Sequence, residues 1–555
     1  MSQAGGGQNP RGKEMPTNPF LTVRSVAPVF ELRGEGEDAV HACTGVHPMP
    51  NQARQQFPAR KSAGTFRVFC LGGSAAQGWP HRPEFSFPGY LRRKLERLLP
   101  DRRVEVINVC AHAYAAYRVK LICDEIVEYE PDLLVIWSGN NEFHEEKKFD
   151  GPWNAPDGPA PKQVIDGVKG ELTAPNLYWA FGRADPNRIE SARFSWVRRH
   201  YAYNLAQMAE AGRRHGARVV LCGVPVNLGG WRPNASVHSP GTVGEALARW
   251  ENAYAEGIRA LEDGRVGDAV ERLTEATRVD PGYAETWFDL GLALQKQGAR
   301  DDAAAAFDRA LMLDAFPFRS VFNDVVRQVA TEQDAIFVDL PAAFRSASAE
   351  RVPGYDLFVD YVHPTPVGNE LAAATVAQRL VDEGVIVAPE NAAAVRDRPG
   401  DDAMPFLERC RVAVMALNLC GSMRQWERVR ELFELLRAST PRMREELEAR
   451  GMTPFLEKFD WVMQSQPVIL DYARLERARR LGCVAEEFDD DEAEVVLYRY
   501  AYHMQARWGS GNAAGGRHRT ISDQELSHFF PRTEYWDEPV PGGGVETERN
   551  EGHQR

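Results

Sequence analysis

Five short runs made up mostly of apolar residues, separated by helical patterns, limit most strongly how this chain can fold. The runs cover residues 68–71, 104–107, 133–137, 219–224 and 336–340. Strands that are buried on both faces of a parallel sheet have this continuous apolar character. Between the runs, apolar side chains recur at helical spacing in residues 90–99, 119–129 and 194–215. Alternating strands and helices predict an α/β domain, a doubly wound five-stranded parallel sheet with helices on both faces.

An internal repeat interrupts this alternation between the fourth and fifth runs. Gly257 recurs as Gly291 and Ala276 recurs as Ala310, in each case 34 positions later. This period resembles the tetratricopeptide repeat, a helix-turn-helix unit with small residues where its helices cross. We expect an inserted helical pair of repeats over residues 245–316. The insert is either a groove that docks a protein partner or a brace for packing and self-association, and the sequence leaves both open.

The repeat divides the chain into a nested series of segments. We expect an irregular N-terminal extension, an α/β domain in two parts around the insert, a helical C-terminal domain and a Gly-rich disordered tail. The α/β parts are residues 66–244 and 317–388. The extension, the helical domain and the tail are residues 1–65, 389–508 and 509–555.

The composition excludes several classes of protein. Asp plus Glu outnumber Lys plus Arg by 79 to 66, so the net charge of −13 argues against a protein that wraps a nucleic acid backbone. No apolar run reaches the roughly 18 residues of a membrane-spanning helix, and the N-terminus lacks the apolar core of a signal peptide. Eight cysteines form no CxxC pair, and no His, Cys and Asp residues have metal-ligand spacing. We therefore expect a cytoplasmic protein with no metal and no cofactor.

A serine follows the first strand in the sequence Gly72-Gly73-Ser74-Ala75-Ala76-Gln77-Gly78. The segment is no phosphate-binding P-loop, because Gly-Lys-Ser/Thr is absent, and it lacks the GxGxxG spacing of dinucleotide-binding folds. It also departs from the GxSxG elbow of the α/β-hydrolases. What remains is a serine at the carboxyl end of a strand, where open α/β sheets place their active sites.

An acid and a histidine lie three residues apart near the other end of the α/β domain, as Asp360 and His363. A carboxylate at this spacing can orient the imidazole while the other ring nitrogen faces a serine. Together with Ser74, the pair makes a candidate catalytic triad.

Two further segments follow the second and third strands. They are Asn108-Val109-Cys110-Ala111-His112-Ala113-Tyr114 and Gly139-Asn140-Asn141-Glu142. The asparagine amide of the latter can donate a hydrogen bond to a developing oxyanion.

The order of these four blocks resembles the SGNH hydrolase superfamily, also called GDSL esterases and lipases. More narrowly, the chain is similar to bacterial SGNH proteins with tetratricopeptide repeats, several of which have GGS followed by GNNEF. The resemblance implies a flavodoxin-like sheet, with Ser74 as nucleophile, His363 as general base and Asp360 as its orienting acid. It places the oxyanion hole at the backbone N–H groups of Ser74 and Ala113 and the amide of Asn141.

One block departs from the family, because Ala113 stands where glycine is usual. A backbone donor survives this change if φ at Ala113 remains negative. The loop after the fourth strand also borders the expected site. Its Asn227 and Arg232 are candidates for binding a polar or anionic part of the substrate, or are solvated loop residues.

Three functions remain open from the sequence. The first is a hydrolase of an ester or related acyl bond, and the second an acyltransferase that uses the same triad on a metabolite, sugar or carrier-bound intermediate. The third is a non-catalytic protein that acts by binding a partner through its repeats. The substrate of either enzyme is expected to be a small-molecule or carrier-bound acyl compound.

Overall fold

The computed structural model describes ten ranges of the chain. They are residues 28–44, 55–143, 148–149, 163–164, 192–315, 319–348, 350–387, 404–423 and 425–451, with most of 471–478. The predicted disordered tail, residues 509–555, lies outside them.

Five parallel strands form the central sheet in the order β10-β9-β6-β4-β5. Their bounds are β4 (Thr65–Gly72), β5 (Arg103–Asn108), β6 (Leu133–Trp137), β9 (Arg218–Cys222) and β10 (Ile336–Val338). The first strand lies near the middle and the chain winds outward in both directions. This order creates a switch point beside β4, where open sheets place their ligands. The predicted doubly wound fold class is confirmed.

Helices cover both faces of the sheet, as two separate apolar clusters show. One cluster joins the strands to α3 (Ala116–Ile126), α4 (Ala192–Arg214) and α9 (Asn323–Glu332). The other joins them to α2 (Phe87–Leu98), α10 (Leu340–Ala347) and α11 (Pro366–Asp382). Every residue of β4 and β6 is buried, which explains why these runs carry no polar alternation.

The sequence predicts an irregular N-terminal extension, but part of this extension is regular. Its described residues contain a three-stranded antiparallel sheet of β1 (Phe30–Arg33), β2 (Val40–Cys43) and β3 (Gln56–Pro58). Phe30 and Phe57 pack edge to face and both contact Tyr129, so the sheet is anchored on the α3 side. Strands of three or four residues are too short to show alternation, which is why the sequence pattern misses them.

The repeat region forms four helices between β9 and α9. They are α5 (Glu245–Glu262), α6 (Val266–Val279), α7 (Ala284–Gln297) and α8 (Arg300–Leu313). A Cβ on Gly257 would lie 2.7 Å from Leu273 Cγ, and a Cβ on Gly291 would lie 3.0 Å from Phe307. Each repeat therefore needs glycine where its two helices cross.

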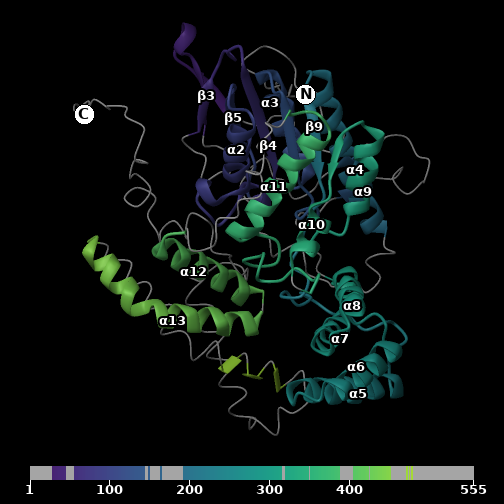
Figure 1. Cartoon of the computed structure of the whole chain (residues 1–555). Helices are drawn as coiled ribbons and strands as arrows, with labels where there is room; N and C mark the ends of the chain where they lie inside the picture. The colour runs from purple at the N-terminus through teal and green to yellow at the C-terminus, as the bar shows by residue number, and fades with distance from the viewer. Residues whose placement is uncertain are drawn as a thin grey trace, which may run out of the picture.

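Two long helices follow the α/β domain, α12 (Phe406–Ser422) and α13 (Trp426–Ala449). In Figure 1, α12 lies between α13 and the α/β part, while α5–α8 lie on the other side below the sheet. Both helices share an apolar cluster with α7, α8 and the segment around Tyr361. No helix of the described ranges is long and apolar enough to cross a membrane.

We predict that Gly257→Ala lowers the free energy of unfolding by about 1–3 kcal/mol, because the added methyl group overpacks the α5–α6 crossing. Denaturant titration followed by circular dichroism measures the change. Gly267→Ala on α6 is the matched control, because a Cβ there meets nothing within 4 Å. Equal stability of the two variants would contradict the crossing geometry.

Candidate active site

The predicted nucleophile block lies at the carboxyl end of the central strand β4. Ser74 is the first residue of the short helix α1 (Ser74–Gln77), and Gly73 precedes it in extended backbone. The N–H of a first helical residue has no partner within its own helix. The serine is partly buried, so the block presents both a hydroxyl and a backbone donor at the sheet edge.

The structure brings the three predicted triad residues together. His363 Nε2 lies 2.8 Å from Ser74 Oγ, and His363 Nδ1 lies 2.6 Å from Asp360 Oδ2. Asp360 is fully buried and His363 is 5% exposed. The carboxylate fixes Nδ1 as the protonated nitrogen and leaves the Nε2 lone pair facing the serine hydroxyl.

The Asp360 carboxylate has further hydrogen-bond donors within its own turn. The backbone N–H groups of Val362 and His363 both donate to Asp360 Oδ1, each at 2.9 Å. A buried carboxylate is costly without such donors, so one oxygen holds the turn and the other holds the imidazole.

Asn227 lies behind this turn rather than toward a substrate. Its Nδ2 donates to the Asp360 carbonyl at 2.9 Å, its Oδ1 accepts from Gly230 N–H, and its side chain is fully buried. The predicted substrate contact does not fit this burial. The amide instead joins the loop after β9 to the triad turn.

Arg232 also differs from the sequence prediction. Its guanidinium pairs with Asp289 on α7 at 2.7 Å and with Glu427 on α13 at 3.1 Å. Burial alone lowers the pKa of Arg232, but these carboxylates and Glu285 raise it well above the ordinary value. The predicted substrate contact does not fit this arrangement, because the guanidinium forms ion pairs that join the insert to the C-terminal helices.

The third block places an amide beside the nucleophile. Asn141 Nδ2 donates to the Tyr114 carbonyl at 3.0 Å, which uses one of its two hydrogens. The same nitrogen would lie 2.5 Å from a Cβ on Gly73. Glycine at position 73 therefore allows the Asn141 amide to approach the backbone of the nucleophile block.

Ala113 has φ of +59°, so the condition that φ remains negative is not met. This left-handed conformation costs a residue with a Cβ about 1–2 kcal/mol and is the natural place for glycine. The segment of residues 108–114 thus has the backbone conformation that glycine would adopt, and Ala113 is strained in it.

Glu142, the last residue of the third block, holds the backbone that follows the second block. Its Oε1 accepts the Ala116 N–H at 2.9 Å, at the first residue of α3. A carboxylate at a helix N-terminus is favoured by the helix dipole. Glu142 therefore joins the segment after β6 to the one after β5.

Trp79 forms a wall of the site that the sequence does not predict. Its ring centroid lies 4.4 Å from that of His363 and 5.9 Å from that of His112. The residue is 9% exposed. Its only sequence signal is a position five residues after Ser74, which no spacing rule identifies.

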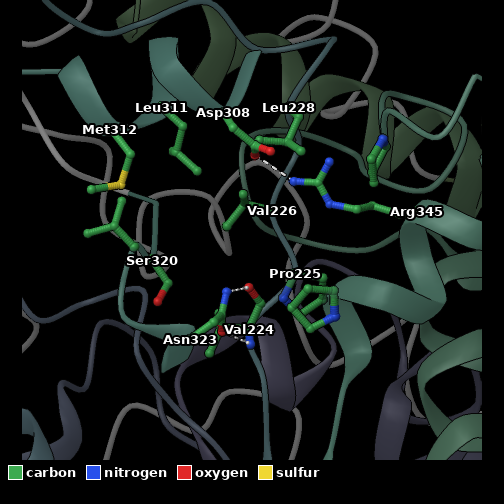
Figure 2. A pocket seen from close by; sticks show the side chains of 13 residues that line it. Val224, Pro225, Val226, Leu228, Asp308, Leu311, Met312, Ser320, Asn323 and Arg345 are labelled. Carbon is green, nitrogen blue, oxygen red and sulfur yellow. Dashed lines mark hydrogen bonds and ion pairs between the residues drawn. The ribbon is translucent and has the colours of Figure 1, made fainter. Parts of the chain in front are cut away.

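A cavity of about 230 Å³ lies beside the third block, between the α/β domain and the insert. Figure 2 shows α8 contributing Asp308, Leu311 and Met312 to its wall, with Arg345 paired to Asp308 at 2.5 Å. Ser320 also lines the cavity, and its N–H donates to Asn140 Oδ1 at 3.1 Å. Among the described residues, no three His, Cys, Asp or Glu side chains gather in a way that could hold a metal ion.

Comparison with protein families confirms the repeat. Residues 254–320 match the tetratricopeptide repeat. The chain is also 28% identical over 79 residues to the uncharacterized protein MJ0572 of Methanocaldococcus jannaschii, a stretch that covers 14% of this chain and 92% of the relative.

Similar solved structures include proteins of the kind that the four blocks predict. The acetylxylan esterase Axe2 from Geobacillus stearothermophilus is 14% identical, with 57% of this chain and 94% of that chain covered and a TM-score of 0.28. A putative lipolytic protein of the G-D-S-L family from Desulfitobacterium hafniense is 11% identical, with 57% and 99% covered and a TM-score of 0.27. The fold class follows from the strand order of the chain itself.

We predict that Gly73→Ala slows phosphonylation of Ser74 by about 100-fold, because the methyl group displaces the Asn141 amide, the donor that the sequence predicts for the oxyanion. The rate constant for labelling by a fluorophosphonate measures this. Gly267→Ala, in open space, is the control. Labelling of Gly73→Ala at the wild-type rate would show that Asn141 does not act at this position.

We predict that Ala113→Gly raises the free energy of unfolding by about 0.5–1 kcal/mol. Relief of the left-handed strain exceeds the entropy that glycine adds to the unfolded chain. Ala374→Gly in the interior of α11 is the control, because glycine is a poorer helix former than alanine and the same change there lowers stability. Denaturant titration distinguishes the two signs, and a loss of stability in both variants would contradict the strain.

Proposed function

We propose that this chain is a serine hydrolase that cleaves an ester or related acyl bond through an acyl-enzyme on Ser74. One observation carries the proposal: Ser74 Oγ, the His363 ring and the Asp360 carboxylate form a continuous hydrogen-bonded line, with distances of 2.8 and 2.6 Å. Nucleophile, base and orienting acid in this geometry define the roles of a catalytic triad, whatever the fold.

In the acylation step, Ser74 Oγ attacks the carbonyl carbon as its proton passes to His363 Nε2. The imidazolium that forms is stabilised by Asp360, whose oxygen already accepts from Nδ1. The tetrahedral intermediate then collapses, and the leaving alcohol takes the proton from Nε2. The products of this step are the alcohol and an ester of Ser74.

Three donors are proposed to hold the oxyanion. They are the backbone N–H groups of Ser74 and Ala113 and the second hydrogen of the Asn141 amide. Ala113 and Asn141 are buried, and a fixed donor in such surroundings contributes more than it would in bulk solvent. Water activated by His363 then attacks the acyl carbon and releases the acid, which restores the serine.

The remaining parts of the proposal concern substrate and partner. We infer a small-molecule or carrier-bound acyl substrate and a cytoplasmic place of action. The tetratricopeptide repeats support an interaction with another protein, which they would bind outside the triad.

We predict that Ser74→Ala abolishes labelling by a fluorophosphonate and lowers hydrolysis of p-nitrophenyl acetate by at least about 1,000-fold, because the nucleophile is lost. In labelling, Ser74 Oγ bonds to phosphorus, fluoride leaves and His363 takes the proton. Ser439→Ala on α13 is the control, since Ser439 is partly buried away from the triad and its hydroxyl donates to the Leu435 carbonyl of the same helix at 2.8 Å.

Absence of labelling in folded wild-type protein would overturn the proposal in favour of a non-catalytic role. Adding an alcohol or amine acceptor to the p-nitrophenyl acetate reaction distinguishes a hydrolase from an acyltransferase that uses the same triad. A hydrolase releases acetate at an unchanged rate, whereas an acyltransferase forms the acetylated acceptor.

A further inference from the structure

The loop that follows the nucleophile helix is bonded to the nucleophile itself. We refer to residues 78–82 (Gly78, Trp79, Pro80, His81 and Arg82) as the Trp79 loop. The N–H groups of Gly78 and Trp79 donate to the Ser74 carbonyl at 3.2 and 3.1 Å. A displacement of this loop would therefore act directly on the backbone of Ser74.

The same loop is bonded to the residue after the general base. His81 Nε2 lies 3.0 Å from the Pro364 carbonyl, and burial lowers the pKa of His81 to about 4. The ring is therefore neutral near pH 7, and Nε2 carries its proton because the carbonyl can only accept. The Trp79 loop is thus attached to both the Ser74 and the His363 segments.

Trp79 occupies the space between these attachments. Its ring lies against the His363 imidazole with an interplanar angle of 59° and meets the His112 ring at 84°. An aromatic ring in this place limits the rotation of the imidazole and attracts it when it becomes charged during acylation. The position of Trp79 therefore bears on the orientation of the general base.

A buried ion pair from α12 holds the other side of the loop. Arg411 Nη2 donates to the Pro80 carbonyl, and Arg411 Nε donates to Glu408 Oε2 at 2.9 Å. Glu408 also lies 3.5 Å from Arg82 Nε. Burial raises the pKa of Glu408, but the two guanidinium groups outweigh it and hold the pKa below the ordinary value.

This pair fixes geometry at a cost in desolvation. Burying two charges often stabilises a fold no better than two apolar side chains of similar size. What the charges add is direction. Arg411 Nε and Nη2 pair with the Glu408 carboxylate, which aims a further Nη2 hydrogen at one carbonyl. Here that carbonyl belongs to Pro80, the residue next to Trp79.

We propose that Glu408 and Arg411 are positioning residues that hold Trp79 against His363, so that α12 completes the active site. The proposal rests on the proposed hydrolase function and extends it. The C-terminal helices then take part in catalysis through the Trp79 loop, although neither Glu408 nor Arg411 touches the reacting atoms.

A double-mutant cycle on the full chain tests this coupling. Arg411→Lys keeps a charge opposite Glu408, but it loses the planar pairing of Nε and Nη2 with the carboxylate that directs a further Nη2 hydrogen at the Pro80 carbonyl. Trp79→Leu keeps apolar bulk and removes the aromatic ring. We expect each to slow fluorophosphonate labelling about 10- to 100-fold, as for a misplaced catalytic group. We expect the double variant to be no slower than Trp79→Leu alone, and Trp79→Phe to recover most of the rate.

The control is Arg437→Lys, which alters another i,i+3 Glu–Arg pair, one that is exposed on α13. It should label at the wild-type rate. Losses that multiply in the double variant, or Trp79→Leu labelling as fast as wild type, would overturn the positioning role. Circular dichroism verifies that each variant is folded, and an unlabelled wild type would instead refute the hydrolase function itself.

Discussion

The buried Asp360 carboxylate is the group on which the rest of the site depends. One oxygen accepts from His363 Nδ1 and the other from two backbone N–H groups of the same turn. A carboxylate without exposed surface is tolerable only when its lone pairs are satisfied, so the turn has little freedom to adopt another shape. The imidazole is then presented to Ser74 in one tautomer and one orientation.

The repeat insert and the C-terminal helices pack against this turn and the loop that holds it. Asn227 holds the Asp360 carbonyl, and five residues later Arg232 pairs with α7 of the insert and α13 of the C-terminal helices. Tyr361 and Val362 share an apolar cluster with α12 and α13. The insert and the C-terminal helices thus form much of the packing behind the Asp360–His363 turn. In this respect the insert and the C-terminal helices are a brace for the site, whatever else the repeats bind.

Much of this arrangement could be predicted from local sequence. The strands were predictable because full burial leaves continuous apolar runs at residues 68–71 of β4 and throughout β6. The repeat was predictable because Gly257 and Gly291 lie at equivalent helix crossings. The four blocks brought Ser74, Asn141, Asp360 and His363 to one sheet edge. Asn227 and Arg232 were predicted near the site, but not as internal links, because their partners lie far along the chain.

Other features have no local signal. Arg411 reaches Pro80 across 331 positions, and no periodicity or motif indicates such a contact. The alanine at position 113 does not itself indicate a left-handed backbone, because its Cβ disfavours that conformation. The strands β1 to β3 are shorter than a pattern can detect.

The most direct test of the central claim is the mass of the protein quenched in acid during turnover of p-nitrophenyl acetate. We predict a transient acetyl adduct that maps to the peptide containing Ser74 and forms in a burst before steady state. Turnover without any adduct, or an adduct on another residue, would contradict the acyl-enzyme mechanism.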